Sequence, residues 1–431
     1  MATTVDRDTA KTSLTFADRY ERVRQLSSTL CETLEPEDCC IQSMADVSPT
    51  RWHLAHTTWF FETFVLSKVD GFRTLKDNFS YLFNSYYNAV GAQFPRARRG
   101  LLSRPTVGEV RAYRDAVDER MRRLLTGDRF FADEDLQTIV ELGLNHEQQH
   151  QELMLTDIKH VFSCNPLWPV YRQGSTAGSG VSSIGNGEGW RRFDEGIYWI
   201  GHSGNNFAYD NESPRHRVFL DAFQLAERLV TCGEYLEFMA DGGYRRPELW
   251  LSEGWSNVCE HHWQAPLYWH LVDEEWREFT LAGLVRLDQQ RPLCHVNYFE
   301  ADAYARWRGA RIPTEAEWEV ASAQVPVSGN FVDLLLEQKR VLHPSVAPAA
   351  RPQLAQMFGD VWEWTTSSYA PYSGYQPAEG ALGEYNGKFM CNQYVLRGGS
   401  CATPSDHIRR TYRNFFPASA RWQFSGIRLA R

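Results

Sequence analysis

The chain has 431 residues, 43% of them hydrophobic, which predicts two or three globular domains with ample cores. No apolar run reaches the roughly 18 residues of a membrane-spanning helix, and residues 1–11 contain no apolar signal region, so we expect a cytoplasmic protein without membrane attachment. The formal net charge of −9 argues against nucleic acid as a main partner. The 9 cysteines form no C-x-x-C pair, which suits a reducing compartment.

Residues 1–171 are predicted to be helical, because apolar residues recur there every three or four positions. Four helices, at 16–34, 49–68, 110–124 and 133–162, predict a four-helix bundle. Ser48 is the expected N-cap of the second helix, with Pro49 in its first turn. The connection from 70 to 105 is long, and loops of such length in compact domains are usually functional.

Three histidines occupy core-facing positions on these helices. His56 shares a stripe with large aromatic residues on the second helix, whereas His53 lies on a flanking face and is expected to be structural or exposed. His146 and His150 lie one turn apart on the apolar stripe of the fourth helix. A buried polar group without a partner costs about 1–3 kcal/mol, and stacked imidazoles do not satisfy each other easily. We therefore predict that His56, His146 and His150 bind one metal ion.

The second half of the chain has a different character. Residues 172–190 are rich in Gly and Ser and are predicted to be a linker. From 191 to 431, short apolar runs alternate with turn residues, and short helices are expected at 235–240, 299–307 and 315–321. The predicted fold class is a helical bundle followed by an α+β domain of short strands and long loops.

Three phrases of this second half resemble the formylglycine-generating-enzyme domain, which has a C-type-lectin-like scaffold. They are residues 311–319 (RIPTEAEWE), 358–364 (FGDVWEW) and 396–400 (LRGGS). In the sulfatase-activating members, a pair of cysteines after the last phrase carries the reaction. Here Cys401 is the one cysteine in that region, so formylglycine formation is not expected.

The first half resembles the DinB-like metal-binding bundle, through the Leu54-Ala55-His56 phrase and the H-x-x-x-H-x-E pattern of His146, His150 and Glu152. Joined together, the two halves resemble the ergothioneine-pathway sulfoxide synthases. This resemblance implies Fe(II), O2 and formation of a C–S bond between hercynine and a thiol. Residues 86–87 (YY) and 412–416 (YRNFF) are similar to the branch that accepts cysteine, with γ-glutamylcysteine as the other candidate thiol. No obligate protein partner is implied.

The resemblance and the chemistry together suggest roles for further residues. A phenol can donate a proton without binding iron strongly, which favours Tyr86 and Tyr87 as catalytic residues. Arg96, or its neighbours Arg98 and Arg99, could bind the carboxylate of the thiol substrate. Gln149 could bind the hercynine imidazole, and Glu152 could orient a ligand. The trimethylammonium group suits aromatic faces and amide oxygens, for which the candidates are Asn414, Phe415, Phe416 and Trp422.

Several other functions fit parts of the sequence. Residues 146–150 match the H-E-x-x-H signature of zinc metalloproteases, although the flanking residues are unusually polar and His56 precedes the motif rather than following it. A thiol S-transferase built on the same bundle would leave the second domain without a purpose. A lectin-like binding protein with a structural metal is the non-enzymatic alternative. Ovothiol-type and selenoneine-forming relatives also remain open.

Overall fold

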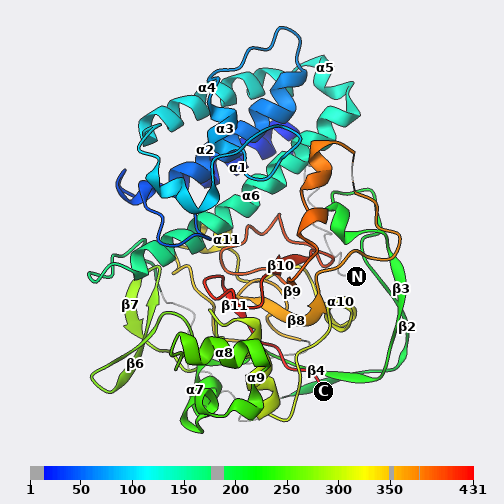
Figure 1. Cartoon of the computed structure of the whole chain (residues 1–431). Coiled ribbons are helices and arrows are strands. Elements are labelled where there is room, and N and C mark those ends of the chain that lie inside the picture. The colour runs from blue at the N-terminus through cyan, green and yellow to red at the C-terminus, as the bar shows by residue number, and fades with distance from the viewer. Residues whose placement is uncertain (1–13, 176–188, 349–353, 378) are drawn as a thin grey trace, which may run out of the picture.

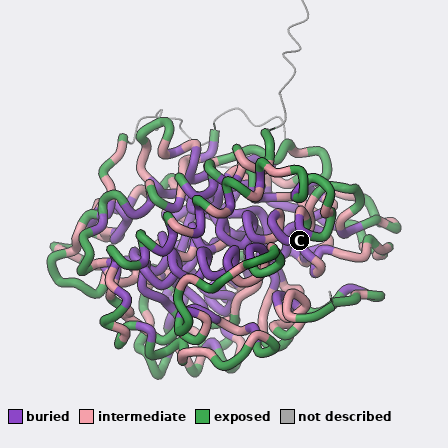
Figure 2. The backbone as a smooth tube through the Cα atoms, turned by 90° about the horizontal axis from the view of Figure 1, so that it is seen from above, coloured by how far each residue is buried: buried purple, intermediate pink, exposed green. Residues whose placement is uncertain are grey.

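The computed structural model describes residues 14–175, 189–348, 354–377 and 379–431. The helices of the first half gather at one end of the molecule, and the strands and short helices of the second half lie against them (Figure 1). Backbone in the middle of the molecule is largely buried (Figure 2), and the side chains of Gln148, Gln149 and Glu152 form hydrogen bonds with residues of the second half. The two halves therefore share an extensive interface.

The N-terminal half is a helical bundle with four main helices. α1, α4 and α6 each begin at a side-chain cap, from Thr15, Thr106 and Asp133 respectively, which satisfies free N–H groups of the first turn. The helices are α1 (Phe16–Thr29), α2 (Thr50–Phe60), α3 (Phe79–Phe83), α4 (Val107–Leu125), α5 (Asp128–Phe131) and α6 (Glu134–Ser163). The predicted four-helix pattern is present, with α3 and α5 as short additions.

The second helix differs in detail from the prediction. It begins at Thr50 with Pro49 as its cap residue, so Ser48 is not the N-cap. Ser48 instead accepts a hydrogen bond from Arg99 at 2.9 Å. The α-helix ends at Phe60 and continues as a π-turn (Phe61–Val65) and a 3-10 turn (Leu66–Lys68). Wider turns of this kind are frequent near functional sites.

α6 is buried on nearly all sides between Gly143 and Lys159, rather than along one stripe. The reason is its position between the bundle and the C-terminal half (Figure 1). A Cβ atom on Gly143 would lie 2.7 Å from the Phe61 ring, so glycine permits the close approach of α6 to the end of α2. Polar residues of α6 that sequence periodicity would place in solvent therefore face the second domain.

In the described part of the C-terminal half, short strands form four small sheets. The central sheet has the order β10-β9-β8-β11, and β5-β6-β7 forms an antiparallel sheet. Two further pairs, β1-β4 and β2-β3, are antiparallel. The strands are β1 (Trp190–Phe193), β2 (Gly196–Ile200), β3 (His216–Leu220), β4 (Phe223–Ala226), β5 (Trp269–Val272), β6 (Glu275–Thr280), β7 (Gly283–Arg286), β8 (Trp362–Ser368), β9 (Tyr394–Arg397), β10 (Asn414–Phe416) and β11 (Ser425–Gly426).

The helices of this half include the three expected from the sequence. These are α7 (Cys232–Ala240), α9 (Tyr298–Trp307) and α10 (Glu315–Ser322), and the structure adds α8 (Ser252–Glu260) and α11 (Val332–Glu337). Most of the expected linker at 172–190 lies outside the described residues. Within the described ranges, no helix is long and apolar enough to cross a membrane.

Candidate metal centre

The three predicted histidines converge at one point in the core of the molecule. His56 comes from α2, and His146 and His150 come from α6. One ring nitrogen from each lies within 4.8 Å of the other two, and the Nε2 atoms of His56 and His146 are 3.1 Å apart. All three residues are buried. This spacing is compatible with a single ion that is bound by all three rings.

The orientation of His56 is set by its neighbours. Its Nδ1 atom lies 2.5 Å from the backbone oxygen of Phe83, which can only accept a hydrogen bond. His56 is therefore protonated at Nδ1 and keeps its lone pair on Nε2, the atom that faces His146. The ring also stacks on Trp52, with centroids 4.6 Å apart and an interplanar angle of 13°. These contacts prepare His56 to bind a metal through Nε2.

His150 is oriented by a second chain of contacts. The Asp157 carboxylate lies 3.1 Å from Nε2 of His53, and Nδ1 of His53 lies 2.8 Å from Nδ1 of His150. With a neutral His53, the carboxylate accepts from Nε2–H and His150 donates from Nδ1, which leaves the lone pair of His150 on Nε2. His53 is thus a buried structural residue, and it orients His150, one of the candidate metal ligands.

The electrostatics of the cluster favour neutral imidazoles. Burial is the main cause that lowers the pKa of all three, to about 3 for His146 and well below the usual range for His56 and His150. Nδ1 of His146 is buried without a hydrogen-bond partner among the described residues. Three neutral imidazoles whose ring nitrogens converge on one point fit a bound metal ion, which all three could ligate.

Glu147, the glutamate of the H-E-x-x-H match, does not belong to this cluster. Its carboxylate binds Arg24 at 2.7 Å, and it also accepts hydrogen bonds from Arg114 and Ser27. Burial opposes its charge, but the two arginines hold the pKa of Glu147 at about 2. A carboxylate engaged in this way cannot serve as a general base at the metal. The metalloprotease alternative is therefore excluded.

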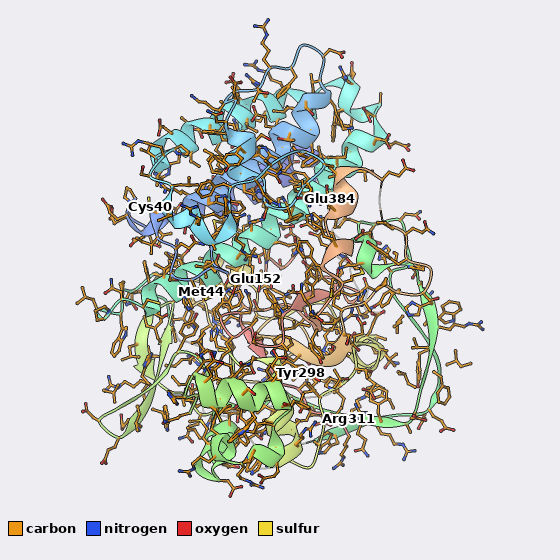
Figure 3. The ribbon with its side chains drawn as sticks, viewed as in Figure 1. Cys40, Met44, Glu152, Tyr298, Arg311 and Glu384 are labelled. Atoms are coloured by element: carbon orange, nitrogen blue, oxygen red, sulfur yellow. The ribbon has the colours of Figure 1, made fainter. Side chains whose placement is uncertain are left out.

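Glu152 joins the histidine helix to the second domain (Figure 3). It accepts hydrogen bonds from the Trp362 indole at 2.8 Å and from the hydroxyls of Thr403 and Ser400. Trp362 and Ser400 belong to the FGDVWEW and LRGGS phrases. These phrases therefore provide a docking surface for α6.

Gln149 lies at the same interface and contacts two tyrosines of the second domain. Its amide donates to the Tyr412 hydroxyl at 2.6 Å and accepts from the Tyr385 hydroxyl. The Tyr385 ring also packs edge-on against His146, with centroids 5.6 Å apart. Tyr385 was not predicted, because it lies in an irregular Gly-containing segment that has no periodicity. Its contact with a candidate ligand makes Tyr385 a further candidate residue of the site.

A cavity of about 1100 Å³ opens beside this contact, between α6 and the second domain. Its wall includes Tyr385, Tyr209, Asn145 and Arg409. Tyr209 stacks on Tyr385 with centroids 5.4 Å apart. A small molecule in this cavity would lie one side chain away from His146.

The predicted tyrosine pair occupies two different environments. Tyr87 is fully buried and packs in the bundle against Phe64 and Trp59. Tyr86 faces the second domain, where its ring lies 6.1 Å from Tyr385 and 5.2 Å from Phe389. Burial raises the pKa of both phenols, so both carry their protons at neutral pH.

The long loop that carries this pair is held by a segment of the second domain. Glu384 accepts hydrogen bonds from the backbone N–H groups of Asn88 and Ala89, and Lys388 donates to the backbone oxygen of Tyr86. Glu384 lies beside the bundle in Figure 3. The second domain therefore fixes the position of the loop.

The arginines of this loop also lie in different environments. Arg96 is exposed and donates to the backbone oxygen of Asp46. Arg99 is buried, lies 3.3 Å from the centre of the Trp52 ring system and donates to Ser48 and Ser85. No carboxylate pairs with Arg99 among the described residues, and burial is the main cause that lowers its pKa. Because Trp52 also stacks on His56, Arg99 is the arginine beside the centre.

The four candidates of the C-terminal tail lie at the interface but divide into two groups. Asn414 and Phe415 are half-buried, and Phe415 stacks on Tyr369 at 4.0 Å and on Phe389 at 5.9 Å. Because Phe389 contacts Tyr86, Phe415 continues an aromatic wall from the bundle loop. Phe416 and Trp422 contact each other at 5.8 Å and pack near Val47, Met44 and Leu267. No contact of this second group with the histidines is found in the described ranges.

Comparisons with known proteins agree with the division of the chain into an N-terminal helical half and a C-terminal half. The family model of the sulfatase-modifying factor enzyme 1-like domain matches residues 193–431, and that of the DinB superfamily matches residues 19–154. The cluster of histidines lies in the DinB match, and Tyr385, Tyr412 and Trp362 lie in the other.

Two of the similar proteins match nearly the whole chain. A hercynine oxygenase of Mycolicibacterium thermoresistibile is 31% identical over 97% of this chain and 96% of its own length. That of Mycolicibacterium smegmatis is 30% identical, over 96% of this chain and 98% of its own length. Ergothioneine biosynthesis protein 1 of Schizosaccharomyces pombe is 27% identical over 52% of this chain and 28% of its own length. The chain therefore belongs to the hercynine oxygenase family of enzymes, in which a DinB-like bundle is joined to a sulfatase-modifying-factor-like domain.

Proposed function

We propose that this enzyme uses Fe(II) and O2 to join hercynine to a thiol, as a sulfoxide synthase of ergothioneine biosynthesis. The reaction balances without an external reductant: the imidazole C–H of hercynine, the thiol and O2 give the sulfoxide and one water. The observation that carries the proposal is the convergence of His56, His146 and His150 at a point where Gln149 meets Tyr385 and Tyr412 of the second domain.

The donor set supports iron as the metal. Three neutral imidazoles leave open positions on an octahedral ion, whereas a structural zinc site is usually closed by four protein ligands. Bound there, Fe(II) would supply the redox chemistry by which O2 oxidises a thiol and an imidazole carbon. A reducing cytoplasm would keep both the iron and the thiol in the required state.

The polar groups around Gln149 support a hercynine site at the interface. The amide of Gln149 and the hydroxyls of Tyr385 and Tyr412 can donate to or accept from an imidazole, and they can donate to a carboxylate. The rings of Tyr86, Phe389 and Phe415 form an aromatic wall that could bind a trimethylammonium group if the ammonium of Lys388, which lies over the Tyr86 and Phe389 rings, moved away. Asn414, at the start of strand β10, which also carries Phe415, adds an amide oxygen that could contact the trimethylammonium group.

Arg99 supports an amino-acid thiol as the second substrate. Its guanidinium is buried, is held by two serine hydroxyls and lacks a carboxylate partner among the described residues. A substrate carboxylate would supply the missing anion. A single compact carboxylate suits cysteine, and γ-glutamylcysteine is the second candidate. Arg96, at the exposed end of the same turn, could contact only a longer substrate.

Tyr86 is the proposed proton donor of the predicted pair. It keeps its proton because burial raises its pKa, and it lies beside Tyr385, which contacts His146. Its hydroxyl would give a proton to the oxygen that is reduced as the C–S bond forms. Tyr87 would support Tyr86 through ring packing, with centroids 4.6 Å apart.

The direct test is anaerobic reconstitution with Fe(II), followed by exposure to O2 with hercynine and one thiol at a time. Mass spectrometry should show a sulfoxide that contains both substrates and one oxygen atom, with cysteine preferred. Histidine in place of hercynine tests the ovothiol-type alternative, and a selenium donor tests the selenoneine alternative. Consumption of O2 without a joined product from any of these pairs would reject the proposal.

A further inference from the structure

A second group of metal-binding side chains lies in the core of the C-terminal half. Glu278 comes from β6, Cys294 precedes α9, and His343 follows α11. One potential ligand atom from each lies within 4.8 Å of the other two. The three residues are 3%, 1% and 2% exposed, so the group is enclosed by protein.

The carboxylate at the centre of this group is ionised: burial opposes its charge, but His343, Lys159 and the Cys294 thiol hold the pKa of Glu278 at about 2. Glu278 Oε2 lies 3.1 Å from His343 Nε2, and Glu278 Oε1 accepts a weak hydrogen bond from the Cys294 thiol at 3.5 Å. Among the residues described by the structure, no lysine or arginine lies within 4.0 Å of it in an ion pair. Glu278 is therefore a deeply buried, ionised carboxylate with a thiol and an imidazole in direct contact and no described cationic side chain in an ion pair, which suits a metal ligand. Nδ1 of His343 is also buried without a hydrogen-bond partner in the described ranges.

The buried cation that acts on Glu278 is Lys159, but its ammonium group does not contact the carboxylate. Lys159, near the end of α6, is fully buried, and its Nζ atom contacts His295 Nε2 at 2.7 Å. The same ammonium group lies over the rings of Tyr268 and Phe424, at 4.7 and 4.9 Å. Lys159 therefore influences Glu278 only at longer range, and it is the group that would balance the carboxylate if no metal were bound.

We propose that Glu278, Cys294 and His343 form a second, buried site for a zinc-class divalent ion, with three protein ligands in place of the four that usually close a structural zinc site. Sulfur, nitrogen and oxygen donors are the set that Zn²⁺ binds in proteins, and a water could complete a tetrahedron. Binding would replace the thiol proton: the Cys294 S–H bond breaks, a S–Zn bond forms, and one proton leaves to solvent. The ion would carry two positive charges against one carboxylate and one thiolate, so the site becomes neutral.

This site is separate from the histidine centre and does not depend on the proposed reaction. Lys159, the contact of α6 with this region, follows His150 by nine residues, which is about 14 Å along a helix. The ion would tie the β5-β6-β7 sheet to the start of α9 and to the loop after α11. Its role would be to hold the part of the second domain against which the end of α6 packs.

Cobalt(II) provides a readout that is independent of activity. Added without any thiol substrate to the metal-free full chain, cobalt bound by Cys294 should give a near-ultraviolet thiolate-to-metal absorption band. The His56, His146 and His150 centre contains no sulfur and cannot produce it. The band should disappear in Cys294→Ser and persist in Cys401→Ser, which removes another buried cysteine of the same domain.

Metal content provides the second measurement. The purified enzyme should bind one zinc per chain in addition to the metal of the histidine centre, and His343→Gln should weaken zinc binding at least tenfold. Circular dichroism shows whether Cys294→Ser and His343→Gln fold. If either fails to fold, zinc binding is measured on Glu278→Gln in its place. No thiolate band in the wild-type protein, or an equal band in Cys294→Ser, would overturn the proposal and leave Lys159 as the counter-charge of Glu278.

Discussion

The carboxylate of Glu152 accepts a hydrogen bond from the indole N–H of Trp362 at 2.8 Å, which joins the histidine helix to the C-terminal half. Glu152 follows His150 by two residues, so this contact sets the position of the helix at the site of the candidate ligands. Burial raises the pKa of Glu152, while hydrogen bonds from Ser400, Thr403 and Trp362 lower it. The carboxylate is thus held by donors from one domain.

Glu152→Ala is expected to destabilise the protein through this interface. Three buried donors would lose their acceptor, at a cost of about 3 kcal/mol in the free energy of unfolding. Urea unfolding measures the loss, and the affinity for iron should fall with it because α6 is no longer held. Glu134→Ala, on an exposed turn of the same helix, is the matched control and should change little.

Arg99→Gln is expected to raise KM for cysteine at least about tenfold, because removal of a charged partner of a carboxylate costs more than 1.4 kcal/mol. KM for hercynine should change much less. Arg96→Gln, three residues earlier but exposed, is the matched control. Equal effects of the two substitutions on KM for cysteine would reject Arg99 as the carboxylate site.

The tyrosine variants test the proton donor. Without a donor, oxidation of the thiol alone to a sulfinic acid competes with formation of the sulfoxide. Tyr86→Phe keeps the ring and its packing, so a shift of products towards the sulfinic acid would report the lost hydroxyl. Tyr87→Phe should shift the ratio less, because Tyr87 packs inside the bundle. Wild-type products and rates in both variants and in the double variant would contradict Tyr86 as the proton donor, and Tyr385 and Tyr412 would be tested next.

Asp360 predicts how stability changes with pH. Burial raises its pKa to about 7 from the usual 3.8, although Ser345 and Asn330 donate hydrogen bonds to it. Between these values the unfolded chain binds fewer protons than the folded chain, so this group stabilises the fold at low pH and loses that contribution as the pH rises to about 7.

Asp360→Asn can keep both hydrogen bonds and removes this titration. Relative to the wild-type protein, its free energy of unfolding should increase between about pH 4 and pH 7, by at most on the order of 4 kcal/mol. Denaturant unfolding across this range measures the difference. Asp221→Asn, at an exposed position, is the control. If the free energies of unfolding of Asp360→Asn and the wild-type protein differed by the same amount at every pH, Asp360 would not titrate as described.

The sequence predicted the parts of the site that lie on regular helices. His146 and His150 are one turn apart, and His56 shares a stripe with Trp52, so helical periodicity was sufficient to find them. The same periodicity could not separate Glu147 from Glu152: both are buried, but one is held by arginines of the bundle and the other by the second domain. That difference depends on which surface covers α6.

The irregular segments were beyond this kind of prediction. Tyr385 reaches His146 from a loop whose position depends on Glu384 binding the bundle. Arg99 and Arg96 lie in one short turn, and only tertiary packing buries the first and exposes the second. The helical segment of the second helix extends to Lys68 as expected, but its apolar pattern did not indicate the change to a π-helical turn after Phe60.

The central claim is that His56, His146 and His150 bind one Fe(II) that is required for turnover. It is tested most directly by anaerobic titration of the wild-type chain and of the three single Ala variants with Fe(II), with iron counted per folded chain. We predict one tightly bound iron in the wild-type protein, with loss of most iron and nearly all sulfoxide formation in each variant. Full iron occupancy and full activity in His56→Ala would contradict the proposed centre.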